Sequence, residues 1–235
     1  MFLDFDAVRP YTRTQERGSS AGEEAVRVGE SEVRAPVQRR AIEKKQRIIE
    51  AGFKLFCEQG FHSTNTAEIA REAGVSTGIV YSYFANKKAI FLETIRLYSD
   101  LILAPMFQFI AALQPPLEME RIVASLLDTF VASHSMAKDA HEEMMAMSHA
   151  DADVAKLFHD FDLQTAQTIA ETLVGFGFRQ DHLLERVHVA RGLMEHHCHE
   201  VVYTRHDAMD YAAMRGIVIA QVVALFAQPP ADGTR

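Results

Sequence analysis

Residues 66–88 read TAEIAREAGVSTGIVYSYFANKK and predict two short helices joined by a tight turn. Thr66 is placed to cap the first helix, whose apolar residues are spaced to lie on one face. Gly74 supplies the positive φ that ends this helix, and Ser76 is placed to cap the second. Two helices joined by so short a glycine turn cross steeply. The stretch therefore predicts a helix-turn-helix that presents its second helix to the major groove of DNA.

The charge distribution favours a nucleic-acid partner, although the whole chain carries a net charge of −8. Residues 37–90 hold nine basic and five acidic side chains, a balance of +4. Residues 91–235 hold ten basic and twenty acidic side chains, a balance of −10. Phosphate contacts dominate the affinity of proteins for DNA, so a basic segment on an acidic body suits a DNA-binding function.

The composition, with 235 residues of which 48% are apolar and 24% charged, is that of a globular protein with a sizeable core. The most apolar run, residues 101–113, contains Pro105 and Gln108 and falls short of the ~18 residues that indicate a membrane span. The N-terminus lacks the basic start and apolar block of a signal peptide, so we expect a cytoplasmic protein. Cys57 and Cys198 are expected to be reduced thiols.

Helical periodicity continues along the chain without strand-like alternation, which predicts an all-α fold. We expect an N-terminal three-helix DNA-binding domain with the helix-turn-helix, and a larger C-terminal helical domain for ligand binding and dimerisation. The expected division is a flexible tail at 1–36, the DNA-binding domain at 37–86, the larger domain at 87–228 and a flexible C-terminus at 229–235. The first helix should begin near residues 38–41 and end at Glu58. Gly52, which costs about 1 kcal/mol relative to Ala inside that helix, indicates close helix packing.

The last expected helix, at about 208–227, is apolar on every side over residues 216–227 apart from Gln221. A helix that is apolar all round must be buried all round, and a second subunit is the simplest cover. The expected helix before it, at about 181–204, offers a further apolar stripe: Leu183, Val187, Ala190, Met194 and Val201. We therefore expect a homodimer through the last two helices, with burial inside one subunit as the alternative. A two-fold dimer also suits DNA, because half-sites repeat every ~34–36 Å along one groove face.

Residues 41–91 resemble the N-terminal domain of the tetracycline-repressor (TetR) family of bacterial regulators. The matching positions are Ile48-Ile49, Ala51, Leu55-Phe56, Gly60-Phe61, Thr66, Ile69-Ala70, Ala73-Gly74-Val75-Ser76, Gly78, Tyr81, Tyr83-Phe84 and Lys87. The resemblance implies an all-α homodimer whose variable body binds a small-molecule effector and then moves the DNA-binding domains off an operator. Most such proteins are repressors.

The same resemblance implies DNA contacts for seven residues, namely Thr66, Ser76, Thr77, Gly78, Tyr81, Tyr83 and Lys87. Thr77 and Gly78 would approach base edges, and the others would anchor the backbone or cap a helix. Lys87 would hold a phosphate with help from the helix dipole. Because the second helix carries no Arg, Asn or Gln, direct base readout should be thin. Four basic residues ahead of it reach either DNA or only solvent: Arg39, Arg40, Lys44 and Lys45.

The body holds a histidine-rich run, residues 196–200, with the sequence HHCHE. Neighbours on a helix point ~100° apart, so these five side chains cannot converge on one ion. His196 with His199 or Glu200 could, which gives at most two or three ligands, below the four of a structural zinc site. We therefore expect a helix-surface or interface cluster and no metal. If these histidines face a partner subunit, protonation near pH ~6 would loosen the dimer.

Four side chains are candidates to line a ligand cavity, with plain core as the alternative: Met145, His149, Phe158 and Phe161. The sequence contains no phosphate loop, nucleophile elbow or HExxH motif, so we expect neither catalysis nor a cofactor. The expected function is a ligand-responsive DNA-binding transcriptional regulator, most simply a repressor released from a palindromic operator by a small-molecule effector. The alternative is a ligand- or metal-binding helical module in which DNA binding is secondary.

Overall fold

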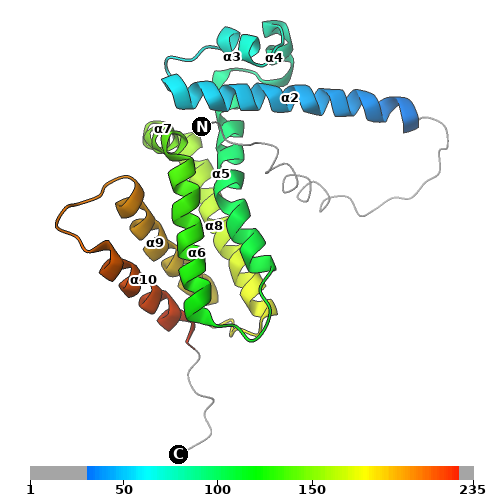
Figure 1. Ribbon diagram of the computed structural model, residues 1–235. Coiled ribbons are helices and arrows are strands. Elements are labelled where there is room, and N and C mark those ends of the chain that lie inside the picture. The colour runs from blue at the N-terminus through cyan, green and yellow to red at the C-terminus, as the bar shows by residue number, and fades with distance from the viewer. Residues whose placement is uncertain (1–30, 228–235) are drawn as a thin grey trace, which may run out of the picture. The chain divides into compact units, whose positions relative to one another are not determined.

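The computed structural model describes residues 31–227, which form helices and no strand (Figure 1). The all-α prediction is confirmed. The helices are α2 (Ser31–Gln59), α3 (Thr66–Glu72), α4 (Thr77–Tyr83), α5 (Lys87–Ala111), α6 (Met119–Met136), α7 (Lys138–Ala150), α8 (Ala152–Gly175), α9 (Leu183–Val202) and α10 (Tyr211–Phe226). Across this described part of the chain, no helix combines the length and the apolar character needed to cross a membrane.

The first described helix begins earlier than expected. α2 starts at Ser31, so residues 31–36, which the sequence assigned to the tail, are helical. A helix that is nucleated elsewhere extends one residue at a time at little cost, so polar residues can prolong it without a core of their own. The rest of the expected tail, residues 1–30, and the expected flexible C-terminus at 229–235 lie outside the described residues.

The described residues fall into two compact units. Unit 1 contains the chain up to Leu101 together with residues 139–150, that is α2, α3, α4, the first part of α5, and α7. Unit 2 contains residues 102–138 and the chain from Asp151 onward, which includes α6, α8, α9 and α10. The boundary inside α5 lies beyond the one expected after residue 86.

Within unit 1, the helices α2, α3, α4 and the start of α5 surround a small apolar core, and we call this part the head. Its buried side chains include Ile48, Phe53, Phe56, Ile69, Val80, Phe84, Ile90 and Phe91. The rings of Phe56 and Phe91 meet edge to face with centroids 5.1 Å apart. A Cβ on Gly52 would lie 2.7 Å from the Cγ2 atom of Ile90, which confirms that this glycine permits close packing of α2 and α5.

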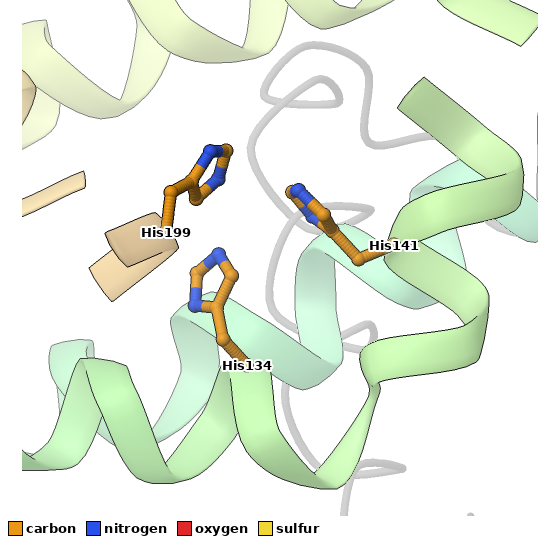
Figure 2. Close-up of side chains that lie close together, drawn as sticks. All are labelled: His134, His141 and His199. Atoms are coloured by element: carbon orange, nitrogen blue, oxygen red, sulfur yellow. The ribbon is translucent and has the colours of Figure 1, made fainter. Parts of the chain in front are cut away.

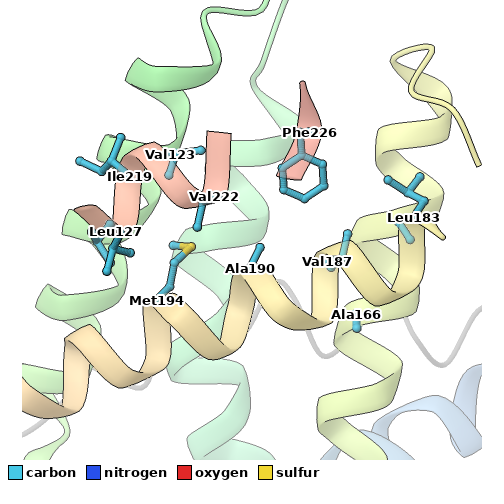
Figure 3. Close-up of a cluster of buried hydrophobic side chains, with 12 residues drawn as sticks. Val123, Leu127, Ala166, Leu183, Val187, Ala190, Met194, Ile219, Val222 and Phe226 are labelled. Carbon is cyan, nitrogen blue, oxygen red and sulfur yellow. The ribbon is translucent and has the colours of Figure 1, made fainter. Parts of the chain in front are cut away.

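Unit 2 is built around an apolar cluster shared by α6, α8, α9 and α10 (Figure 3). Its members are Val123, Leu127, Ala166, Ala170, Leu183, Val187, Ala190, Met194, Val218, Ile219, Val222 and Phe226. The α9 stripe expected at a subunit interface therefore faces the core of its own chain over Leu183–Met194. Periodicity shows that a stripe must be covered, but it does not distinguish cover by α6, α8 and α10 from cover by a second subunit.

Candidate nucleic-acid interface

The turn between α3 and α4 has the geometry that the sequence indicated. Gly74 adopts φ +65°, a left-handed conformation that glycine takes without steric cost. The Ser76 side chain accepts a hydrogen bond from the backbone N–H of Ile79 at 3.4 Å and caps α4. The two short helices are thereby fixed in a helix-turn-helix.

The cap of α3 is Asn65 and not Thr66, which corrects the sequence analysis. The Oδ1 atom of Asn65 accepts hydrogen bonds from the backbone N–H groups of Ala67 and Glu68, and the Glu68 carboxylate accepts from the Asn65 N–H. This is a capping box, and its signal was present in the sequence as an Asn followed three residues later by a Glu. Thr66 is thereby released from capping and occupies the first position of the helix.

The Thr66 hydroxyl instead contacts the side chain of Tyr81, and the two oxygens are 3.0 Å apart. This contact joins the start of α3 to the middle of α4. Tyr81 is 57% exposed, and a hydroxyl has one donor and two acceptor sites, so the pair retains capacity for another partner. The two hydroxyls present a small polar platform at the surface of the helix pair.

The outward face of α4 carries little bulk. Thr77, Gly78 and Tyr81 are exposed, while Tyr83 is half-buried. A Cβ built on Gly78 would meet only the Ser76 hydroxyl, at 3.9 Å, and Gly78 has no positive φ. The fold therefore does not require glycine at this position. The missing side chain leaves the backbone of α4 open to close approach from outside.

Lys87 has a role that the sequence did not indicate. Its ammonium group donates to the backbone carbonyl oxygens of Phe61, Thr64 and His62 at 2.5, 2.7 and 3.4 Å. It also lies 4.3 Å from the centroid of the Phe61 ring. An ammonium has three N–H donors, so these carbonyls can engage all of them. Lys87 thus fastens the loop between α2 and α3 to the start of α5.

The same loop is held from α7 as well. The Glu143 carboxylate accepts a hydrogen bond from the backbone N–H of Phe61. Gly60 precedes it with φ +81°, which confirms the glycine stop expected after α2. With Lys87 bound to its carbonyl and Glu143 to its N–H, Phe61 is fixed by one positive and one negative side chain, which positions α3 behind α4.

Two of the four basic residues ahead of the helix-turn-helix have acidic partners. Arg39 pairs with Glu43 on the exposed surface of α2. Lys45 lies 3.3 Å from the Glu93 carboxylate and 5.8 Å from the centre of the Phe84 ring. Exposed ion pairs of this kind contribute less than about 1 kcal/mol, so a phosphate can compete with them.

The four candidate ligand-binding residues divide between the two units. Met145 and His149 lie in α7, where His149 is exposed and its ring nitrogen bonds the Met145 carbonyl at 2.7 Å. Phe158 and Phe161 lie in α8 and are half-buried. Their role in ligand binding stays a prediction.

The histidine-rich run of α9 points in several directions. His196 is exposed, whereas His197 and Cys198 are buried. Burial raises the pKa of the Cys198 thiol to about 12, as it does for Cys57, and both cysteines are free. Burial also lowers the pKa of His197. His199 turns toward His134 of α6 (Figure 2). The pairing of His196 with His199 or Glu200 that the sequence suggested is therefore replaced by one between two helices.

Comparison with known proteins places the head in a recognised group. Residues 48–94 match the family model for bacterial regulatory proteins of the tetR family. The HTH-type transcriptional regulator HbdR of Aromatoleum sp. (strain CIB) is 48% identical over 54 residues, 23% of this chain and 24% of that protein. The fatty acid metabolism regulator protein of Bacillus subtilis (strain 168) is 28% identical over 134 residues, 57% of this chain and 62% of that protein. The chain thus spans less than two thirds of either relative.

A similar fold occurs in a solved structure. The crystal structure of a putative TetR-family transcriptional regulator from Mesorhizobium loti superposes with a TM-score of 0.62 at 19% sequence identity. The match covers 79% of this chain and 96% of that one. The likeness therefore extends beyond the head to the helical arrangement as a whole.

Proposed function

Since this chain belongs to the TetR family of bacterial regulatory proteins, we propose that it regulates transcription by binding double-stranded DNA through α4. The observation that carries the proposal is the outward face of α4, where a capped helix exposes its backbone at Gly78 beside Thr77 and Tyr81. Its surroundings are basic, with a balance of +4 over residues 37–90. The named relatives are regulators of transcription, which agrees with the absence of a catalytic motif.

The contacts divide by the chemistry of the side chains. The hydroxyls of Thr66, Tyr81 and Tyr83 are donors for phosphate oxygens, and Ser76 orients α4 through its cap. Thr77 and the Gly78 backbone approach base edges. With so few base-reading groups, affinity comes mainly from phosphates and specificity from small contacts and DNA shape.

Lys87 contributes to DNA binding chiefly by fixing the loop beneath α3. Its ammonium is engaged with three carbonyls, so a direct phosphate contact requires one of these bonds to be exchanged. The phosphate contact implied by the family resemblance stays a prediction.

The proposed dimer uses the outward face of α10. Ile217 is 63% exposed there, which is unusual for a large apolar side chain unless a partner covers it. The neighbouring exposed positions are all small and permit close helix approach: Ala213, Gly216, Ala220 and Ala224. On α9, the exposed positions that remain for a partner include Val189 and Gly192.

We expect Ile217→Glu to convert the dimer to a monomer, because two buried carboxylates would face each other across the two-fold axis. Sedimentation velocity at several concentrations measures the mass of each species. Leu163→Glu is the matched control, since it places the same charge on an exposed apolar residue of α8. A wild-type monomer, or a dimer that survives Ile217→Glu, would refute this interface.

We expect Thr77→Ala to relax sequence preference at one or two base positions, with little loss of affinity for random DNA. The Thr77 side chain is exposed and offers a methyl and a hydroxyl to base edges, and single contacts of this kind discriminate by about 1–3 kcal/mol. Binding to a panel of single-base operator variants measures the preference. Equal losses on specific and random DNA would assign Thr77 to the backbone instead.

Regulation by a small-molecule effector, with repression in its absence, completes the proposal. An effector that binds one conformation of unit 2 more tightly shifts the population toward it and changes DNA affinity by its differential binding energy. Met145, His149, Phe158 and Phe161 remain the proposed lining residues. A cytoplasmic location follows from binding to chromosomal DNA.

The deciding experiment is selection of bound sequences from a random DNA pool with the purified full-length protein, at two salt concentrations. We expect a palindrome with half-sites about one helical turn apart and an affinity that falls steeply with salt. A pool that shows no enrichment would favour the alternative, a helical ligand- or metal-binding module.

A further inference from the structure

Two histidines and a carboxylate meet inside unit 2, on α6 and α9. The nitrogens of His134 and His199 lie within 4.8 Å of one another, and their rings turn toward each other (Figure 2). The Nε2 atom of His199 lies 3.4 Å from Oε1 of Glu195. His134 is 1% exposed, while His199 and Glu195 are half-buried. The three side chains therefore form a partly enclosed set of nitrogen and oxygen donors.

The His134 ring is oriented as a metal ligand requires. Its Nδ1 atom lies 3.0 Å from the backbone carbonyl oxygen of Phe130. A carbonyl can only accept, so the proton is on Nδ1 and the lone pair is on Nε2. Histidines that bind metals commonly hold their second nitrogen on a carbonyl in this way, which fixes both tautomer and ring orientation.

The α9 residues have a matching geometry. Glu195 and His199 are four residues apart, so they lie on one face of the helix one turn apart. Ligands at about 2.0–2.1 Å from a tetrahedral ion are about 3.3–3.4 Å from each other, close to the spacing of these two atoms. The Tyr203 ring packs edge-on against His199 with centroids 5.3 Å apart and limits its movement.

We propose that His134, Glu195 and His199 bind a divalent transition-metal ion, for which Zn²⁺ is the probe. Two imidazoles and one carboxylate suit Zn²⁺ and its neighbours, whereas Mg²⁺ and Ca²⁺ require oxygen ligands. A water molecule takes the fourth position. The His196–Glu200 run alone supplied too few converging ligands, and His134 of α6 provides the missing one.

The ion would join α6 to α9 within the unit assigned to effector binding. The proposal does not depend on the function in DNA binding, because metal affinity is measured without DNA. Failure of one leaves the other standing.

The test is a titration of the full-length, tag-free protein with Zn²⁺ in competition with a chromogenic chelator, after treatment with a stronger chelator and gel filtration. We expect one Zn²⁺ per chain with a dissociation constant below about 1 μM. His199→Ala and Glu195→Gln, both at half-buried positions, should each weaken binding by at least about 10-fold, and His134→Ala by about 100-fold. Co²⁺ should give the visible absorption of a tetrahedral ion in the wild type and not in His199→Ala.

His196→Ala is the matched control, because it removes an exposed imidazole from the same helix. It should bind Zn²⁺ as the wild type does. Circular dichroism confirms that each variant is folded, and His199→Ala decides the question if His134→Ala is not. The proposal is overturned if the wild type binds less than one Zn²⁺ per chain, or if His196→Ala loses as much affinity as His199→Ala.

Discussion

Replacing Lys87 with Met is expected to lower the melting temperature of the protein and to weaken its binding to every DNA sequence alike. The change keeps the length of the side chain and its contact with the Phe61 ring, but it removes the donors to three backbone carbonyls. Hydrogen bonds from a charged group contribute about 1.5–3 kcal/mol, and water can replace part of that at this partly exposed loop. We expect a loss of about 2–3 kcal/mol, or roughly 4–12 °C for a chain of this size.

Melting followed by circular dichroism and DNA binding across a salt series separate the two roles of Lys87. If Lys87 only held a phosphate, the melting temperature would not change and the slope of log affinity against log salt would fall by about 1. Lys44→Met in α2 is the control for the loss of one positive charge from the head. An unchanged melting temperature in Lys87→Met would show that the carbonyl contacts do not support the loop.

Gly78→Leu is expected to abolish specific DNA binding while leaving the fold intact. A side chain at this position meets nothing closer than the Ser76 hydroxyl, and leucine favours a helix over glycine by up to about 1 kcal/mol, so stability should be equal or higher. The added bulk would stand on the face proposed to enter the major groove and hold the backbone away from the bases. We expect at least a 100-fold loss of affinity, about 2.7 kcal/mol.

Fluorescence anisotropy with the selected operator measures this loss, and thermal melting checks the fold. Gly175→Leu in α8 is the matched control, because a side chain there also meets open space in a helix. It should bind DNA as the wild type does. Wild-type affinity in Gly78→Leu would show that α4 does not approach the bases through this face.

The two substitutions act on different layers of the same surface. Gly78 is at the contact itself, where a change alters binding without altering the fold. Lys87 lies beneath it, where a change alters the loop that positions α3 and thus the Thr66–Tyr81 hydroxyl pair. Together they test whether the geometry of the helix pair or its charge carries the affinity.

The sequence by itself determined the local structure of the head. Gly74 with positive φ, the Ser76 cap and the tight packing at Gly52 depend on steric and hydrogen-bonding rules that act within a few residues or at a single contact. The choice of cap at α3 was wrong only because Asn65, one residue earlier, satisfies a capping box with Glu68. That signal is also local and could have been found.

Only the tertiary structure decided which distant groups meet. The Lys87 side chain reaches carbonyls more than twenty residues earlier, His134 meets His199 across two helices, and the α9 stripe faces its own core and not a partner. Periodicity shows that a face must be covered or that a charge needs a partner. It does not say by what, because the partner is set by how helices pack, and that depends on the whole chain.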